Sequence, residues 1–374
     1  MNDNVHPAAA HSPDYIRGIN PYVPGKPIEE LAREYGLAER DIVKLASNEN
    51  PRGPSPKVRA AIAEAAAGVT RYPDGNGFAL KEALAARFAV SGEQIVLGNG
   101  SNDILELATQ AFLRPGDRTV YAQHAFAVYP LATQARGGVG IEVPARGLGH
   151  DLAAMRAALT PNTRIVFVAN PNNPTGTWVP PGEVEAFAAS VPREVLVVLD
   201  EAYNEYLEPA QQADSVAWVA RYPNLLVSRT FSKAYGLAGL RVGYGIADPS
   251  VADLLNRVRQ PFNVNSIAQA AALAALADVE YVAESARLNR QGMRDLERGL
   301  DALGVAHVPS HANFLLIRAG SGSDAGPVYE ALLRAGVIVR PVASYGLPGY
   351  LRVTVGLPDE NKRFLTALAA ALGR

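Results

Sequence analysis

Cysteine is absent from the 374-residue sequence. Its absence excludes disulfide bonds, zinc–thiolate sites and a cysteine nucleophile, and it is consistent with a reducing compartment. Long apolar runs are missing too, because no stretch of about eighteen apolar residues could cross a membrane. The first thirty residues carry prolines, charges, His6 and His11 where a signal peptide needs an apolar core. We therefore expect a cytoplasmic protein without a membrane anchor.

The sequence also has no excess of charge of one sign. The 35 lysines and arginines nearly balance the 37 aspartates and glutamates, so the formal net charge is −2. Runs of about five or more like charges, which are typical of nucleic-acid-binding and membrane-surface segments, do not occur. We therefore expect small-molecule substrates, with no nucleic-acid partner, no membrane partner and no bound metal.

What the sequence does contain is an alternation of valine- and isoleucine-rich runs with alanine-rich stretches. The apolar runs predict strands, and stretches between them such as 101–113 and 181–191 predict helices. This alternation is typical of a mostly parallel sheet that is covered by helices on both faces. The seven predicted strands cover residues 94–98, 118–122, 140–144, 164–170, 195–200, 224–229 and 241–247.

The pattern changes near Pro261, which indicates a second domain. A long helical region at 266–304 is followed by shorter apolar segments up to residue 356, and these predict a smaller α+β domain. We expect an N-terminal segment that packs on the small domain and on a dimer partner. The three expected units are residues 1–47, 48–275 and 276–374.

One lysine lies just past the sixth predicted strand. Lys233 has hydroxyl groups nearby at Thr230 and Ser232, and Arg241 lies eight positions further on. This set suits an aldehyde cofactor that carries a phosphate, because a guanidinium can hold a phosphate by two parallel hydrogen bonds. Taken alone, a lysine after a serine is also common on exposed turns.

Polar clusters follow three more of the predicted strands. Ser101 and Asn102 open a predicted helix whose free N–H groups could bind a phosphate, although an ordinary helix cap explains them equally well. Asn173 lies in "NPNNPTG", which turn formation alone could explain. Asp200 ends a strand, and Tyr203 follows it. Because ligands bind at the carboxyl ends of strands in open α/β sheets, these clusters together predict one shared site.

Together the clusters resemble the fold-type I family of pyridoxal-phosphate enzymes, and among them the histidinol-phosphate aminotransferase branch. The resemblance extends from "INPYVPGKPIEEL" at 19–31 to the last helix. It implies an α/β fold, with a large domain built on a mostly parallel seven-stranded sheet flanked by helices and a smaller α+β domain. It also implies pyridoxal 5′-phosphate as the cofactor.

The resemblance gives each of these residues a role. Lys233 corresponds to the lysine that forms the Schiff base with the cofactor. Asp200 corresponds to the partner of the pyridine nitrogen, because an adjacent carboxylate favours the protonated nitrogen. Asn173 and Tyr203 correspond to hydrogen-bond donors to the ring oxygen. The residues that correspond to the phosphate site are Ser101, Asn102, Thr230, Ser232 and Arg241.

Tyr72, in "TRYPDGNG", matches a tyrosine that reaches the phosphate from the neighbouring subunit. The resemblance therefore implies a homodimer with shared active sites, in which each subunit contributes to the other's site. The other explanation for Tyr72 is an aromatic ring that packs within its own loop.

Two arginines are expected to bind the substrate. Arg352 lies in an alternating segment at 350–356, faces away from its apolar neighbours and resembles the family's carboxylate-binding arginine. Arg340 and Tyr22 resemble the pair that holds a distal anionic group. Asn48 is expected to line the same pocket.

One departure from the family's pattern concerns the substrate. Where members often have a threonine and a tyrosine before the last tyrosine of an aromatic motif, this chain reads "AFAVY" at 125–129. Phe126 can still stack on the pyridine ring, but one hydroxyl donor for a substrate phosphate is missing. An aromatic amino acid such as phenylalanine or tyrosine is therefore an alternative substrate.

The expected reaction is reversible transamination of histidinol phosphate and 2-oxoglutarate to imidazole-acetol phosphate and glutamate, a step of histidine biosynthesis. Lys233 is expected to move the proton of the substrate Cα. A threonine-phosphate decarboxylase is one alternative on the same fold, and it would release carbon dioxide without an oxo-acid acceptor. A non-enzymatic ligand-binding regulator is another, but it would need a fused helix-turn-helix, for which the N-terminal segment is too short.

Overall fold

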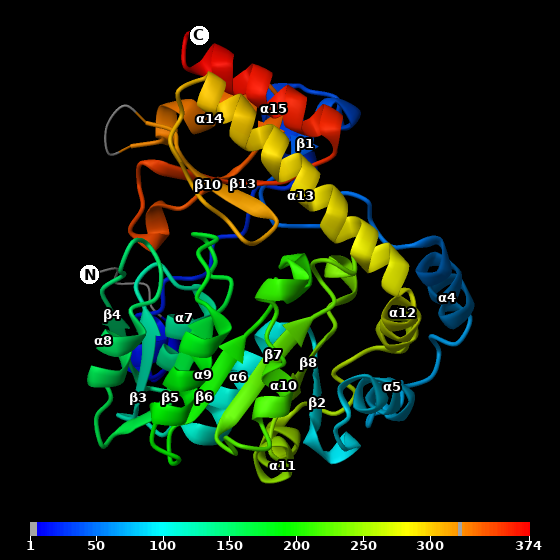
Figure 1. The fold of residues 1–374 in the computed structure, drawn as a ribbon, viewed down its shortest axis with the longest axis vertical. Helices are drawn as coiled ribbons and strands as arrows, with labels where there is room; N and C mark the ends of the chain where they lie inside the picture. Colours follow the sequence, from blue (N-terminus) through cyan, green and yellow to red (C-terminus); the bar gives the residue numbers. More distant parts are fainter. Residues whose placement is uncertain (1–5, 321–323) are drawn as a thin grey trace.

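Two sheets organise the chain in the computed structural model, which describes residues 6–320 and 324–374 (Figure 1). The larger sheet has seven strands, and each of them overlaps one of the seven predicted strands. In spatial order its strands are β2 (Ile95–Gly98), β8 (Gly243–Ile246), β7 (Leu225–Thr230), β6 (Leu196–Asp200), β5 (Thr163–Ala169), β3 (Arg118–Ala122) and β4 (Val139–Val143).

The large sheet is parallel except at β8, which pairs antiparallel with both β2 and β7. This arrangement confirms the expected mostly parallel sheet. Strand β8 begins two residues later than predicted, and Arg241 has a left-handed backbone with φ of 55° at this point. A left-handed residue cannot continue a strand, so the chain turns before β8 begins.

Helices cover both faces of the large sheet, as the alternation predicted. Along β5, Val166 and Val168 pack in one core cluster and Ile165 and Phe167 in another, so successive side chains enter opposite faces. The helices of the first cluster are α4 (Pro56–Ala66), α5 (Phe78–Phe88), α8 (Leu152–Ala157), α9 (Pro181–Ser190), α10 (Ser215–Trp218) and α12 (Ser266–Ala277). Those of the second are α6 (Ser101–Phe112), α7 (Val128–Gln134) and α11 (Pro249–Val258).

The smaller sheet lies above the large one in Figure 1, and three helices pack on one of its faces. Leu351 and Val353 of its central strand belong to that core, whereas Arg352 and Thr354 point the other way, toward the large sheet. The strands are β12 (Arg340–Pro341), β13 (Tyr350–Thr354), β10 (Phe314–Arg318) and β9 (His307–Val308). The helices are α13 (Val279–Ala302), α14 (Gly326–Arg334) and α15 (Pro358–Ala371).

The predicted helical region at 266–304 is two helices, α12 and α13, which meet at Asp278 with a bend of 78°. Asp278 has φ of −99° and ψ of 60°, outside the helical range, and its Oδ1 accepts a hydrogen bond from Lys57 Nζ at 2.9 Å. Within the described ranges no single helix is long and apolar enough to span a bilayer, although this bent pair passes that test of length and composition.

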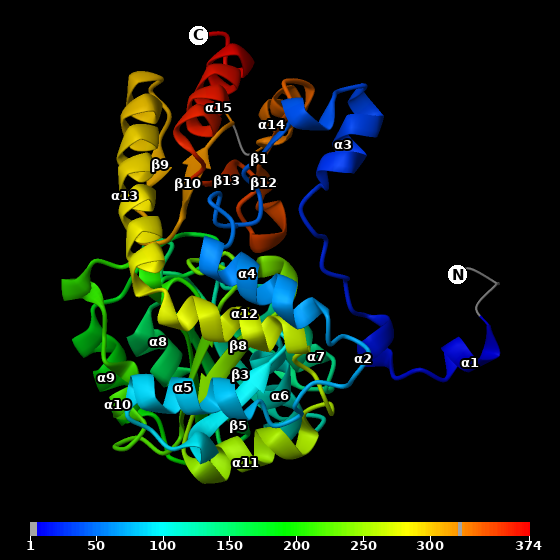
Figure 2. The same ribbon diagram turned by 90° about the vertical axis from the view of Figure 1, so that its right-hand side faces the viewer.

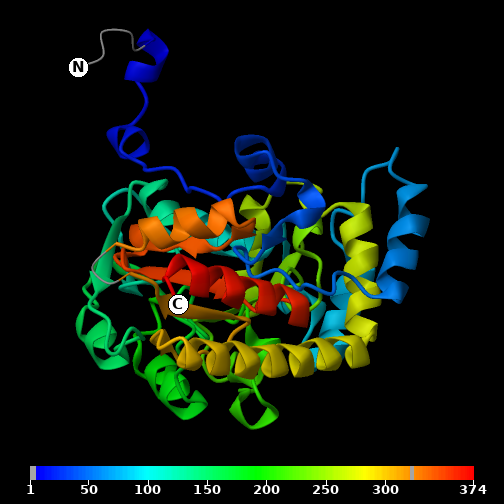
Figure 3. The same ribbon diagram turned by 90° about the horizontal axis from the view of Figure 1, so that it is seen from above.

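The N-terminal segment runs along both parts of the molecule (Figure 2). Strand β1 (Val43–Lys44) pairs in parallel with β11 (Val337–Ile338), and Leu31 of α3 (Ile28–Tyr35) packs against Ile338. The first two short helices, α1 (Pro7–Ala10) and α2 (Asp14–Arg17), extend away from the sheets, as seen from above in Figure 3. The 3₁₀ turns are η1 (Glu39–Asp41), η2 (Gly92–Gln94), η3 (Asn204–Tyr206), η4 (Pro209–Gln211), η5 (Ala238–Leu240) and η6 (Ala343–Tyr345).

Candidate active site

A cavity of about 350 Å³ lies between the carboxyl ends of β5, β6 and β7 and the small sheet. Its lining includes every residue proposed for the site from the sequence except Tyr72. Ligand sites at this edge are expected in an open α/β sheet. The proposed residues that line it are Tyr22, Asn48, Ser101, Asn102, Phe126, Asn173, Asp200, Tyr203, Thr230, Ser232, Lys233, Arg241, Arg340 and Arg352.

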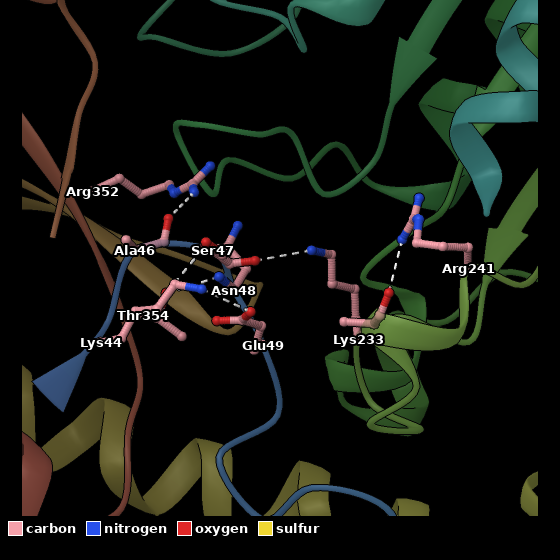
Figure 4. Close-up of polar contacts among 10 residues, drawn as sticks. Lys44, Ala46, Ser47, Asn48, Glu49, Lys233, Arg241, Arg352 and Thr354 are labelled. Carbon is pink, nitrogen blue, oxygen red and sulfur yellow. Dashed lines mark hydrogen bonds and ion pairs between the residues drawn. The ribbon is translucent and has the colours of Figure 1, made fainter. Parts of the chain in front are cut away.

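Lys233 projects into the middle of this cavity from the turn after β7. Its Nζ donates a hydrogen bond to the backbone oxygen of Ser47 at 3.1 Å (Figure 4). Burial, together with the positive charge of Arg352, lowers the pKa of Lys233 to about 8, although Glu49 acts in the opposite direction. Near neutral pH a usable fraction of the amine is therefore unprotonated, which both a nucleophile and a general base require.

Asp200 ends β6 and is only 5% exposed. Its Oδ2 accepts a hydrogen bond from the hydroxyl of Tyr129 at 2.9 Å, and the Tyr129 ring stacks on Phe167. In the part of the chain that the structure describes, Asp200 Oδ1 is buried and has no partner. Burial raises the pKa of Asp200 to about 6, and the Tyr129 hydrogen bond opposes that rise. An unpaired buried carboxylate oxygen needs a donor to satisfy it.

Tyr203 and Asn173 also line this cavity. Asn48 Nδ2 donates to the Tyr203 hydroxyl oxygen at 2.9 Å, while burial raises the pKa of Tyr203 to about 12. Asn173 Oδ1 accepts a hydrogen bond from Arg352 Nη1. Its amide nitrogen therefore remains the group with which Asn173 could donate to a ligand.

At one end of the cavity, groups carried by the large sheet can bind an anion. Ser101 and Asn102 form the first turn of α6, where backbone N–H groups are free. Arg241 Nη1 approaches Ser232 Oγ at 3.4 Å, and a Cβ atom on Gly100 would lie 2.5 Å from Arg241 Nη2. Glycine at position 100 therefore lets the guanidinium lie over the start of the helix.

The opposite end carries two arginines on neighbouring strands of the small sheet. Arg340 and Arg352 are directly paired across β12 and β13, and both are buried. Arg352 Nη2 donates to the backbone oxygen of Ala46 at 2.6 Å, but its buried Nε has no partner within residues 6–320 and 324–374. Arg340 Nη2 donates to Val23 O, and its guanidinium lies 5.3 Å from the centre of the Tyr22 ring. Two buried guanidinium groups side by side favour an anionic ligand.

Comparisons with known proteins agree with this geometry. The family model for class I and II aminotransferases matches residues 40–368. The chain is 62% identical over 363 residues to histidinol-phosphate aminotransferase 2 of Ralstonia nicotianae, with 97% of both chains covered. It is 61% identical over 357 residues to histidinol-phosphate aminotransferase 2 of Pseudomonas aeruginosa, with 96% of both covered. The chain belongs to the histidinol-phosphate aminotransferase family.

A solved structure of another member has the same fold. The histidinol-phosphate aminotransferase from Sinorhizobium meliloti, in complex with pyridoxal 5′-phosphate, superposes with a TM-score of 0.89 at 31% identity, and 96% of each chain is covered. The expected fold-type I architecture is therefore confirmed for this family member.

The residues of the cavity fit pyridoxal phosphate. The unpaired Asp200 Oδ1 matches a protonated ring nitrogen, and Lys233 lies where an amine could reach an aldehyde. The helix start at Ser101 and the guanidinium of Arg241 match a phosphate. Phe126 lines the cavity and meets Tyr129 edge-to-face, with ring centroids 5.9 Å apart. The family assignment and the donor set therefore point to the same group.

Tyr72 is the one proposed site residue that lies outside the cavity. It is 82% exposed, and its ring stacks on Phe262 with centroids 4.7 Å apart. Within one chain, Tyr72 therefore packs against Phe262. Its assignment to the partner's phosphate site stays a prediction.

Sequence reasoning missed several residues that shape the site. Tyr129 was considered only as the end of an aromatic motif, yet it holds Asp200. Ser47 contributes a backbone oxygen, which no side-chain pattern could reveal. Thr354 lies two residues after Arg352, on the same face of β13, so the strand alternation that placed Arg352 could also have placed Thr354. Among the described residues, no cluster of three or more potential metal ligands occurs.

Proposed function

We propose that the protein transfers an amino group between histidinol phosphate and 2-oxoglutarate, with pyridoxal 5′-phosphate as cofactor, in histidine biosynthesis. The observation that carries this proposal is the position of Lys233, which lines one cavity together with Asp200 and the buried Arg340 and Arg352. The 62% identity to a histidinol-phosphate aminotransferase supports the choice of substrate. In the forward direction the same reaction forms histidinol phosphate from imidazole-acetol phosphate and glutamate.

We assign the chemistry at the substrate Cα to Lys233. Bound pyridoxal phosphate withdraws electrons from that carbon, and Lys233 Nζ, in its neutral form, removes the Cα proton. Asp200 keeps the ring nitrogen protonated, and Tyr129 keeps Asp200 oriented. Asn173 and Tyr203 would donate hydrogen bonds to the ring oxygen. The residues that would hold the phosphate are Ser101, Asn102, Thr230, Ser232 and Arg241.

The substrate is held at the arginine end. Arg352 binds the α-carboxylate of glutamate in one half-reaction and the phosphate of histidinol phosphate in the other. Arg340, with Tyr22 beside it, binds a distal carboxylate. Both arginines are buried, so their hydrogen bonds to a carboxylate or phosphate are stronger than those of exposed side chains.

The test is a comparison of kcat/KM for histidinol phosphate, phenylalanine and tyrosine, each with 2-oxoglutarate. We expect histidinol phosphate to give the highest value. The second candidate is an aromatic amino acid aminotransferase, which the apolar Ala125, Ala127 and Val128 around Phe126 favour. A higher value for phenylalanine would establish that candidate, and carbon dioxide release from threonine phosphate without an oxo acid would instead indicate a decarboxylase.

We further propose that the protein is a cytoplasmic homodimer in which Tyr72 reaches the partner's phosphate site. The support is the 82% exposure of this aromatic side chain, which stacks on the exposed Phe262. Large exposed aromatic groups that lie together favour a protein–protein interface.

Mixed dimers test the role of Tyr72. A dimer of one Lys233→Ala chain and one Tyr72→Ala chain has one site with both Lys233 and Tyr72, but only if Tyr72 acts across the interface. We expect the mixed dimer to reach up to half of the wild-type activity, because one of its two sites is complete. If purified mixed dimers show no more than half of the activity of the Tyr72→Ala parent, Tyr72 does not act across the interface.

We also propose the domain limits 48–275 and 276–374, with residues 1–47 as a separate segment. The support is the break between α12 and α13 at Asp278, close to the proposed limit. Limited proteolysis of the intact protein, with mass analysis of the fragments, tests these limits.

A further inference from the structure

Asn48 occupies an unusual position for a pocket-lining residue. It has a left-handed backbone with φ of 55° and is 1% exposed. An asparagine tolerates this conformation better than most residues, but it still needs neighbours that hold it there. The conformation places the Asn48 side chain against Tyr203.

Thr354 holds Asn48 by two hydrogen bonds. The backbone N–H of Asn48 donates to Thr354 Oγ1 at 3.0 Å, and Thr354 Oγ1 donates to Asn48 Oδ1 at 3.2 Å (Figure 4). Asn313 Nδ2 adds a third contact, to the backbone oxygen of Asn48 at 3.0 Å. With Oδ1 occupied by Thr354, the amide of Asn48 is fixed with its Nδ2 toward the Tyr203 hydroxyl.

This orientation decides what the Tyr203 hydroxyl can do. A tyrosine hydroxyl has one proton to donate and accepts at its oxygen. Asn48 Nδ2 donates to that oxygen at 2.9 Å, so the proton is left for an acceptor in the cavity that Tyr203 lines. The same contact favours the ionised form of Tyr203 and so opposes the increase of its pKa by burial. A hydroxyl that is held in this way is a stronger donor.

The same short segment also contacts the other reactive groups. The backbone oxygens of Ala46 and Ser47 accept hydrogen bonds from Arg352 and Lys233, respectively. Strand β13 thus reaches residues 46–48 with two side chains, Arg352 and Thr354. Figure 4 shows these contacts meeting on one segment.

We propose that Thr354 is a positioning residue, which acts through Asn48 to aim the Tyr203 hydroxyl proton at the ring oxygen of the bound cofactor. This proposal rests on the proposed function, because it takes pyridoxal phosphate as the ligand. Thr354 contacts neither cofactor nor substrate in this scheme. Its hydroxyl group, and no other part of its side chain, is required.

The test measures the visible absorbance of the cofactor-loaded protein as a function of pH. A weaker Tyr203 donor leaves more negative charge on the ring oxygen and therefore raises the proton affinity of the neighbouring linkage to Lys233. We expect the midpoint of the absorbance change to rise by about half a pH unit or more in Thr354→Val. In Thr354→Ser, which keeps the hydroxyl, it should stay near the wild-type value.

The matched control is Thr163→Val. Thr163 is also a buried threonine whose Oγ1 makes two local contacts, with the backbone N–H and the hydroxyl of Thr160, but it lies at the start of β5, outside the cavity lining. This variant should lose stability without a change in the midpoint. Other charged or titratable groups near Tyr203 stay unchanged in these variants; they are Tyr129, Asp200, Tyr206, Lys233, Tyr345 and Arg352.

A second variant tests the same connection if Thr354→Val folds poorly. Asn48→Gly keeps a residue that adopts φ of 55° readily and removes the amide donor. It should raise the midpoint as Thr354→Val does, and the double variant should raise it no further, because both changes break one chain of contacts.

Several results would overturn the proposal. An unchanged midpoint in Thr354→Val or in Asn48→Gly contradicts it, and so does a Thr354→Ser midpoint that moves as far as that of Thr354→Val. These results are distinct from a failure of the proposed function, in which wild-type protein loaded with pyridoxal phosphate and then freed of unbound cofactor by gel filtration would retain no visible absorbance band at any pH.

Discussion

The two ends of the cavity differ in where their charged groups come from. At the phosphate end, Ser232 and Arg241 follow β7 in sequence and Ser101 opens the helix after β2, so the large sheet alone positions them. At the other end, Arg340 and Arg352 are paired across two strands of the small sheet. Arg241 is exposed, whereas the two arginines of the small sheet are 7% and 6% exposed.

This difference separates two tasks. The phosphate end can form without the small sheet, so we infer that it keeps one ligand stably bound. The arginine end is complete only when the sheets are docked, because Arg352 contacts Asn173, which follows β5 of the large sheet. Its charges are also less solvated, so each interaction with an anion there has a larger effect on the free energy of binding.

The largest effect is expected at the residue between the two ends. Lys233→Ala should lower turnover by at least about 10³-fold with every substrate, because the variant loses both nucleophile and general base. Steady-state rates check the loss, and borohydride reduction of the wild-type protein followed by peptide mapping should place the cofactor on Lys233. Lys362→Ala, at an exposed lysine in α15, is the control and should be fully active. Cofactor attached at another lysine contradicts the assignment.

An intermediate effect should distinguish the two arginines. Arg352→Ala should lower kcat/KM for glutamate and for phenylalanine alike, by about 30- to 4000-fold, because it removes a buried charge-assisted contact to the α-carboxylate. Arg340→Ala should affect glutamate and spare phenylalanine, which has no distal anion. Single-turnover measurements with both amino acids check this difference.

Arg241→Ala provides the comparison from the phosphate end. It should weaken cofactor binding and leave the ratio of glutamate to phenylalanine activity unchanged. If Arg340→Ala loses activity equally with glutamate and with phenylalanine, the assignment of Arg340 to the distal carboxylate is contradicted.

The smallest effect concerns the stability of the cofactor-free protein. The pKa of Asp200 is raised to about 6, so its ionised form is disfavoured in the folded state, and the folded state loses stability as the pH rises toward and through 6. Asp200→Asn avoids that loss. The free energy of unfolding of Asp200→Asn, taken relative to wild type, should be higher at pH 8 than at pH 5 by about 1 to 1.5 kcal/mol.

Urea unfolding of both cofactor-free proteins at the two pH values measures this difference. Glu106 lies outside this cavity, and desolvation together with the charge of Asp103 raises its pKa, so Glu106→Gln is a control for the loss of another carboxyl group with a raised pKa. A stability difference between Asp200→Asn and wild type that does not depend on pH would contradict the inferred pKa.

The features that the sequence predicted are those that local patterns encode. Apolar runs rich in valine and isoleucine located all seven strands of the large sheet, and the signal is strongest at β5 and β6, which are parallel and buried on both faces. The motif around Lys233 was recognisable because its residues are close in sequence. The contact of Tyr129 with Asp200 was not, because 71 residues separate them and no periodicity shows which loops meet.

The same limit applies to the long helical region. No proline or glycine lies at the junction of α12 and α13, yet the helices separate at Asp278, whose side chain binds Lys57 on α4. The break thus coincides with a contact to a distant element. Asn48 shows a similar gap, since the sequence placed it in the pocket but gave no sign that Thr354 holds it from 306 residues away.

That separation bears on the order in which the protein folds. Residues 46–48 are synthesised early, but β1 and Asn48 gain their partners β11 and Thr354 only when nearly the whole chain is present. Closing so large a loop is entropically costly and slow compared with forming local contacts. The large sheet has no such requirement, because its strands end at residue 246. Competence for catalysis is therefore acquired late in folding, after the scaffold that carries Lys233 is already in place.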